Sequence, residues 1–171
     1  MSVSIKRIVI PFLLVSVALL TACQSQPPVE NEGSKIVTVS VLPQQYFVQR
    51  IAGDLVQVNV MVDPGQSPEN YEPTPQKMRL VSQSSIYFTI GFPFEANWMV
   101  KFTAGNPQMK IVDTNSGVER IPLTSHNHDG VESEHSGELD PHVWLSARNA
   151  QMQAKNIAAA LIEMDADNQQ I

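Results

Sequence analysis

The chain has 171 residues, 11 basic and 17 acidic side chains, a formal net charge of −6 and one cysteine. An acidic chain is repelled by phosphate backbones, and no basic patch with interleaved aromatic residues offsets this, so nucleic acid is excluded as a partner. A single cysteine excludes an internal disulfide, so stability must come from burial or from a bound metal. A small cation is the natural partner of such a chain.

The first 22 residues are typical of a secretory signal peptide. Lys6 and Arg7 precede an apolar run over 8–20 that is shorter than a membrane span. The run leads into LLTAC, and small residues directly before Cys23 resemble a lipobox, where bacteria acylate the cysteine and cleave in front of it. We therefore expect residues 1–22 to be removed and Cys23 to anchor an extracytoplasmic lipoprotein to a lipid membrane. The alternative is a plain secretory peptide with a chance cysteine.

Residues 23–35 predict a flexible tether between lipid and fold, because Pro, Gly and polar side chains follow one another there without apolar period. Lys6 and Arg7 are the only charged residues before Cys23. A chain that begins at Cys23 therefore has nine basic and 17 acidic residues, a formal net charge of −8. This strengthens the expectation of a cationic ligand.

From residue 36 the pattern alternates between strand and helix. Valines alternate with polar residues in two stretches, and two shorter apolar runs follow, each of strand length. Thr74 can cap a helix that has Pro75 at its first position, and Ser146 can cap the last helix. We expect strands at 37–41, 56–62, 86–90 and 109–113 and helices at 45–52, 75–82, 94–103 and 147–164.

This alternation predicts an α/β fold over 36–171. Right-handed crossovers would give a parallel sheet of about four strands with helices on both faces. Ligands of such sheets bind at the carboxyl ends of the strands, and the loop over 63–73 leaves the second strand at that edge.

All four histidines lie between His126 and His142, among carboxylates. Imidazole and carboxylate are zinc ligands, and they also suit manganese when oxygen ligands predominate. Residues 125–140 contain glycines and serines and no histidine pair at helical spacing. We expect His126, His128 and His135 to lie in a mobile loop that captures metal weakly, the alternative being an acidic, solvated loop with incidental histidines.

Two further residues are candidate ligands. His142 stands directly before the apolar residues Val143-Trp144-Leu145, where packing would fix its ring; the alternative is a satisfied core histidine. Glu69 lies in the proline-rich loop PGQSPENYEPTP, and a stiff loop holds a carboxylate with little loss of entropy on binding. The alternative is that the prolines only shape a turn, with both acids in solvent. Glu72 is the rival carboxylate.

No enzymatic motif is present: the chain lacks HExxH, GxSxG and a phosphate-binding glycine-rich loop. We therefore expect no enzymatic activity. A metallohydrolase that uses a metal-bound water is the minor alternative.

Several motifs, in this order, resemble the zinc and manganese substrate-binding lipoproteins of bacterial ABC transporters, the solute-binding protein 9 family. They cover nearly all of the chain: LLTAC, VSVLPQQYFVQRIAGDLVQVNVMVDPGQSP running into YEPTPQKM, IYFTIGFPFE, NPQMKIVD, and LDPHVWL before the last helix. The resemblance implies two α/β lobes joined by a long helix, with one metal ion held between them. This chain would be the N-terminal lobe, with the C-terminal lobe absent.

By the same resemblance, His142 matches the ligand histidine of the family's DPHxW motif, while Glu69 stands where a histidine is common. A carboxylate there would favour manganese, whereas the histidine-rich loop resembles that of zinc-type members. Zinc is the favoured ion and manganese the alternative, delivered to an ABC permease. The alternative function is a truncated adhesin-like lipoprotein, or a remnant lobe without a competent metal site.

Overall fold

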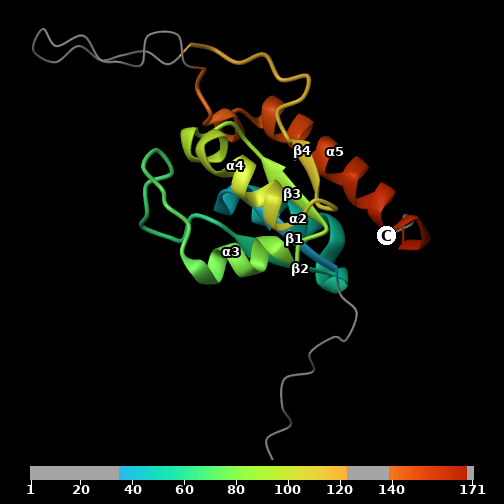
Figure 1. The fold of residues 1–171 in the computed structure, drawn as a ribbon. Helices are drawn as coiled ribbons and strands as arrows, with labels where there is room; N and C mark the ends of the chain where they lie inside the picture. Colours follow the sequence, from blue (N-terminus) through green and yellow to red (C-terminus); the bar gives the residue numbers. More distant parts are fainter. Residues whose placement is uncertain (1–34, 123–138, 169–171) are drawn as a thin grey trace, which may run out of the picture. The chain divides into compact units, whose positions relative to one another are not determined.

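The computed structural model describes residues 35–122 and 139–168. Its centre is a sheet in the order β2-β1-β3-β4, and every neighbouring pair is parallel (Figure 1). The strands are β1 (Lys35–Val39), β2 (Val56–Val60), β3 (Ile86–Thr89) and β4 (Lys110–Asp113). The prediction of a parallel sheet of about four strands is confirmed.

Helices cover both faces of the sheet, as predicted, and each face has its own hydrophobic core. In the described part of the chain, the α-helices are α2 (Leu42–Ala52), α3 (Pro75–Ser82), α4 (Pro93–Gly105) and α5 (Ala147–Met164). One core packs under α3 and α4 and includes Tyr87, Phe94 and Phe102; the other packs under α2 and α5 and includes Phe88 and Ile157. Each of these five side chains is at most 1% exposed to solvent.

Local chemistry explains where the helices begin and end. The Thr74 side chain accepts a hydrogen bond from the Lys77 amide at 3.3 Å, which caps α3 as predicted. Gly53 ends α2 with φ of 53°, a conformation that glycine adopts without strain. Ser146 is the N-cap residue of α5, but its side chain makes no capping hydrogen bond, so only its position was predicted correctly.

Helix α2 begins three residues earlier than predicted, at Leu42 rather than at 45. Proline is tolerated in the first turn, and Pro43 occupies it. The buried Gln44 side chain accepts hydrogen bonds from the amides of Ser40 and Val41, which satisfies donors at the start of the helix.

Three short 3-10 helices complete the described part: η1 (Gly53–Leu55), η2 (Val143–Leu145) and η3 (Ala166–Asn168). Among the described residues, no helix is both long enough and apolar enough to cross a membrane. The expected signal peptide (1–22), Cys23 and nearly all of the tether lie outside the described residues, so these assignments stay predictions. So do His126, His128 and His135, because 123–138 are not described.

Candidate metal centre

A hollow of about 740 Å³ opens at the carboxyl edge of the sheet. Its lining comes from the loop after β2, from α4 and the loop before it, and from the chain on either side of 123–138. The side chains that matter for chemistry are Glu69, Phe92, Glu95, Arg120 and His142. The fold therefore brings Glu69 and His142, which are far apart in the sequence, to one hollow.

His142 precedes η2, and its neighbours restrict the imidazole ring. The ring lies edge-on to Phe92, with 5.5 Å between the centroids, and 5.3 Å from the centroid of Trp144. The next residue, Val143, is buried in the core under α3 and α4. The His142 side chain nevertheless stays 38% exposed. The ring is thus held in place without being sealed in the core.

Asp140 decides which nitrogen of that ring is available. Its Oδ1 accepts a hydrogen bond from the His142 backbone amide at 2.9 Å and lies 2.8 Å from Nδ1 of the ring. The pKa of Asp140 is lowered from its ordinary value, chiefly by the His142 backbone N–H, with smaller effects from the His142 ring and the Arg120 charge. An ionised carboxylate only accepts hydrogen bonds, so in a neutral ring this contact favours the proton on Nδ1 and leaves the lone pair on Nε2, where a metal can bind.

Sequence reasoning assigned Asp140 no role. A signal was present, since aspartate commonly accepts a bond from the backbone amide two residues later, and here that residue is His142. The pattern Asp-Pro-His therefore encodes both a turn and the tautomer of the histidine.

Glu69 reaches the hollow from a loop that is fixed at several points. Tyr71 is buried and lies edge-on to Phe94, with 5.2 Å between the ring centroids. Burial and the nearby Asp63 charge raise the pKa of Tyr71 to about 12. Lys77 of α3 forms an ion pair with Asp63 at 2.8 Å and also donates to the Val60 carbonyl. The Glu69 side chain itself is exposed and accepts a hydrogen bond from Ser67.

The structure separates Glu69 from its rival Glu72. A second, smaller hollow of about 430 Å³ is lined by both carboxylates together with Tyr71, Trp98 and Lys101. Glu69 also lines the larger hollow that contains His142, whereas Glu72 does not. Of the two acids, Glu69 is the one that shares a hollow with the imidazole.

A buried carboxyl, Glu95, ties the loops behind the larger hollow together. Its oxygens accept hydrogen bonds from the Ser40 hydroxyl and from the amides of Ile90 and Gly91, the latter two at 2.9 and 2.6 Å. Burial is the main cause that raises the pKa of Glu95. Burial and the Glu95 charge likewise raise the pKa of Tyr87, whose hydroxyl lies 3.0 Å from the Ser40 oxygen. Sequence reasoning missed Glu95, because its burial depends on contacts with distant residues.

The candidate ligands among the described residues do not by themselves complete a metal site. Within 35–122 and 139–168, no three His, Cys, Asp or Glu side chains are grouped so that they could hold a metal ion. Zinc takes four ligands in structural sites, and three protein ligands plus water in catalytic ones. One imidazole and one carboxylate have the right chemistry, but they leave coordination positions for other donors.

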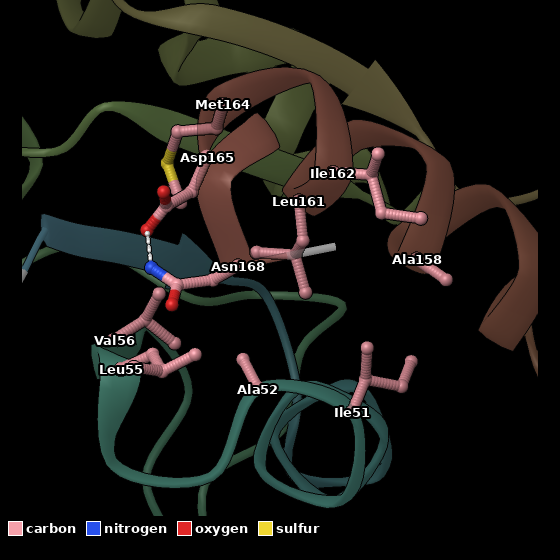
Figure 2. Close-up of a pocket in the computed structure, with 10 residues that line it drawn as sticks. All are labelled: Ile51, Ala52, Leu55, Val56, Ala158, Leu161, Ile162, Met164, Asp165 and Asn168. Carbon is pink, nitrogen blue, oxygen red and sulfur yellow. Dashed lines mark hydrogen bonds between the residues drawn. The ribbon is translucent and has the colours of Figure 1, made fainter. Parts of the chain in front are cut away.

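An apolar groove elsewhere has no such chemistry. It has a volume of about 130 Å³ and lies between the end of α2 and the last turns of α5, where Figure 2 shows Ile51, Leu55 and Leu161 around it. Its two polar side chains, Asp165 and Asn168, bond to each other at 3.0 Å (Figure 2). The lining offers a single carboxylate and no imidazole, so it lacks the pair of candidate ligands found in the larger hollow.

Comparison with known proteins supplies the family. Residues 37–171 match the family described as zinc-uptake complex component A, periplasmic (ZnuA). The chain belongs to this family. It is a family of solute-binding proteins rather than enzymes, which confirms the expectation that no catalytic activity is present.

Individual relatives are similar to most of this chain, but only to about half of their own length. The metal ABC transporter substrate-binding lipoprotein SsaB of Streptococcus sanguinis is 32% identical over 165 residues, 91% of this chain and 50% of SsaB. A zinc-bound deletion mutant of ZnuA is 37% identical with a TM-score of 0.70, over 80% of this chain and 49% of that one. A manganese-bound periplasmic metal binding protein from Candidatus Liberibacter asiaticus is 27% identical with a TM-score of 0.67, over 79% and 47%.

The chain spans about half the length of the relatives it matches. This agrees with the prediction of one lobe of a two-lobed protein.

Proposed function

We propose that the chain is the substrate-binding component of an ABC importer, which captures a divalent cation with Glu69 and His142. One observation carries the proposal: a carboxylate and an imidazole line the same hollow, and Asp140 reserves the His142 Nε2 lone pair for a ligand. The ion would be bound and passed to the permease unchanged, with no bond made or broken.

Zinc is the favoured cargo and manganese the alternative. Imidazole suits zinc, and the proposed role of His126, His128 and His135 is to raise the local concentration of the same ion. The Glu69 carboxylate is a harder ligand than the histidine common at this place in the family, and it shifts the balance toward manganese. The similar structures support both candidate ions, since they include one with zinc and others with manganese.

The location of the protein belongs to the same proposal. Cys23 would carry the acyl chains that hold the domain at the outer side of a membrane, close to the permease. Two observations support this: the LLTAC sequence itself, and the description of relatives such as SsaB as lipoproteins.

Isothermal titration calorimetry with zinc and with manganese tests the ligands, using the chain from residue 24 onward. We expect His142→Ala and Glu69→Gln each to weaken the tightest binding event at least about tenfold, because each removes a donor atom from the ion. Glu72→Gln is the matched control, since it makes the same change in the same loop outside the larger hollow, and its affinity should equal that of the wild type.

A second control separates the site from the histidine-rich loop. Replacing His126, His128 and His135 together by Asn should reduce only the weaker binding events. If His142→Ala and Glu69→Gln bind as tightly as the wild type, the proposed site is wrong.

A further inference from the structure

Arg120 bridges two strand-like segments beside the proposed site. Its Nη2 donates to the Leu139 carbonyl at 2.7 Å and its Nε to the Asp140 carbonyl at 3.3 Å. The backbone reinforces this bridge, because the Asp140 amide donates to the Ile121 carbonyl at 2.8 Å and Pro122 pairs with Leu139. The segment that contains Asp140 is therefore held by the guanidinium and by its neighbouring backbone together.

Gly91 provides the space in which the guanidinium lies. A Cβ at this position would come within 2.8 Å of Nη1 of Arg120 and within 3.3 Å of its Cζ. Gly91 also has φ of 96°, which other residues rarely adopt. The amide of Gly91 is fixed in turn by Glu95. The backbone conformation thus favours glycine here, and any side chain at this position would have to displace the guanidinium.

The presence of Arg120 in the lining needs a physical explanation. A fixed positive charge in the hollow that holds Glu69 and His142 opposes the entry of a divalent cation. The same guanidinium donates two hydrogen bonds to backbone carbonyls, and these can offset the repulsion. Its planar fork can hold two carbonyls at once, which the single ammonium of lysine does less well.

We infer that Arg120 is a positioning residue: by holding the backbone of residues 139 and 140, it aims the Asp140 carboxylate at Nδ1 of His142 and so leaves Nε2 as the metal-binding nitrogen. The contacts run in one line, from the Arg120 guanidinium to the Asp140 carbonyl, and from the Asp140 carboxylate to the His142 ring. The consequence for metal affinity rests on the proposed function, whereas the consequence for the ring tautomer does not.

The tautomer is measured first, on metal-free protein with ¹⁵N-labelled histidine at a pH where imidazole is neutral. In the wild type we expect the His142 signals of a ring protonated at Nδ1. Arg120→Met should give a mixture of the two tautomers. In Arg120→Lys, the fraction of rings protonated at Nδ1 should lie between those of the wild type and Arg120→Met. A general loss of stability would not change the tautomer while the protein remains folded, so circular dichroism and thermal melting accompany each spectrum.

Zinc affinity is measured next, and its direction is diagnostic. Removal of a positive charge alone would strengthen cation binding, but loss of positioning should weaken it about tenfold in Arg120→Met. Arg148→Met is the matched control: it removes the same charge from an exposed position on α5, and its affinity should be unchanged or slightly higher.

Gly91→Ala tests the same device from the other side. The added Cβ should displace the guanidinium, and therefore mix the tautomers as Arg120→Met does. In the double variant with Arg120→Met, alanine should cause no further tautomer change, because the arginine is already gone. An unchanged His142 tautomer in both Arg120→Met and Gly91→Ala, or tighter zinc binding by Arg120→Met, would overturn the inference. Unchanged binding by His142→Ala would instead refute the proposed function and leave the tautomer result standing.

Discussion

Replacing Asp140 by Asn tests how strongly the orientation of His142 controls metal affinity. The Asp140 carboxylate accepts two hydrogen bonds from His142, at 2.9 Å from the backbone amide and 2.8 Å from Nδ1. Hydrogen bonds to a charged group contribute about 1.5–3 kcal/mol and neutral ones about 0.5–1.5 kcal/mol. Asparagine can still accept both, so the ring bond should weaken by about 1–1.5 kcal/mol, which corresponds to an about five- to twelvefold weaker zinc affinity at roughly 1.4 kcal/mol per factor of ten.

Asp140→Ala removes the acceptor altogether and should weaken zinc binding by about 10- to 100-fold. Competition against a chromophoric zinc chelator measures both variants in one buffer. Asp113→Asn is the matched control, because the Asp113 carboxylate accepts a similar bond, from the Asn115 amide at 2.9 Å, and does not line the larger hollow. If Asp140→Ala binds zinc within twofold of the wild type, the carboxylate does not control the ligand nitrogen and the reasoning fails.

Three further predictions concern stability. Phe102→Ala should lower the free energy of unfolding by about 3–5 kcal/mol, because a fully buried ring that stacks on Tyr87 at 5.3 Å leaves a cavity; urea denaturation measures it, and a loss below 1 kcal/mol would contradict it. Thr74→Ala should cost about 1 kcal/mol through the lost cap, with Thr74→Ser close to wild type; equal losses in both would exclude capping as the cause. Because burial raises the Glu95 pKa above its ordinary 4.5, this carboxyl favours folding most at low pH, and stability falls as pH rises through the raised pKa. Glu95→Gln should therefore gain stability relative to the wild type as pH rises. A constant difference between the urea midpoints of the two proteins from pH 4 to 8 would refute this.

The sequence predicted the framework because its signals are local. Alternating valines, the Thr74-Pro75 helix start and Gly53 at a helix end act through neighbouring residues, and each defines an element wherever the chain later packs. The parallel direction of the strands followed from the strand-helix alternation, since parallel strands need crossovers, whereas the strand order β2-β1-β3-β4 came from the structure alone. The start of α2 was misplaced because the bonds that begin it come from a buried glutamine side chain rather than from a serine or threonine.

The site was only partly predictable, since it depends on contacts between distant segments. His142 and Glu69 were identified from residue type and surroundings, and the structure places both in one hollow. The family resemblance favoured Glu69 over its rival Glu72, and the hollows support the same choice, since only Glu69 of the two lines the one with His142. Glu95 and Arg120 look like ordinary surface charges in the sequence; only the fold shows that one is buried and that the other lies against Gly91.

The parallel arrangement of β1 to β4 also separates the residues that stabilise the fold from the loop residues that are candidate ligands. Both hydrophobic cores lie against the faces of the sheet, whereas the candidate ligands lie in loops beyond the strand ends. Exchanging a donor in such a connection leaves the buried framework untouched. One scaffold can thus be retuned from one cation to another by altering a few loop side chains, without having to fold differently.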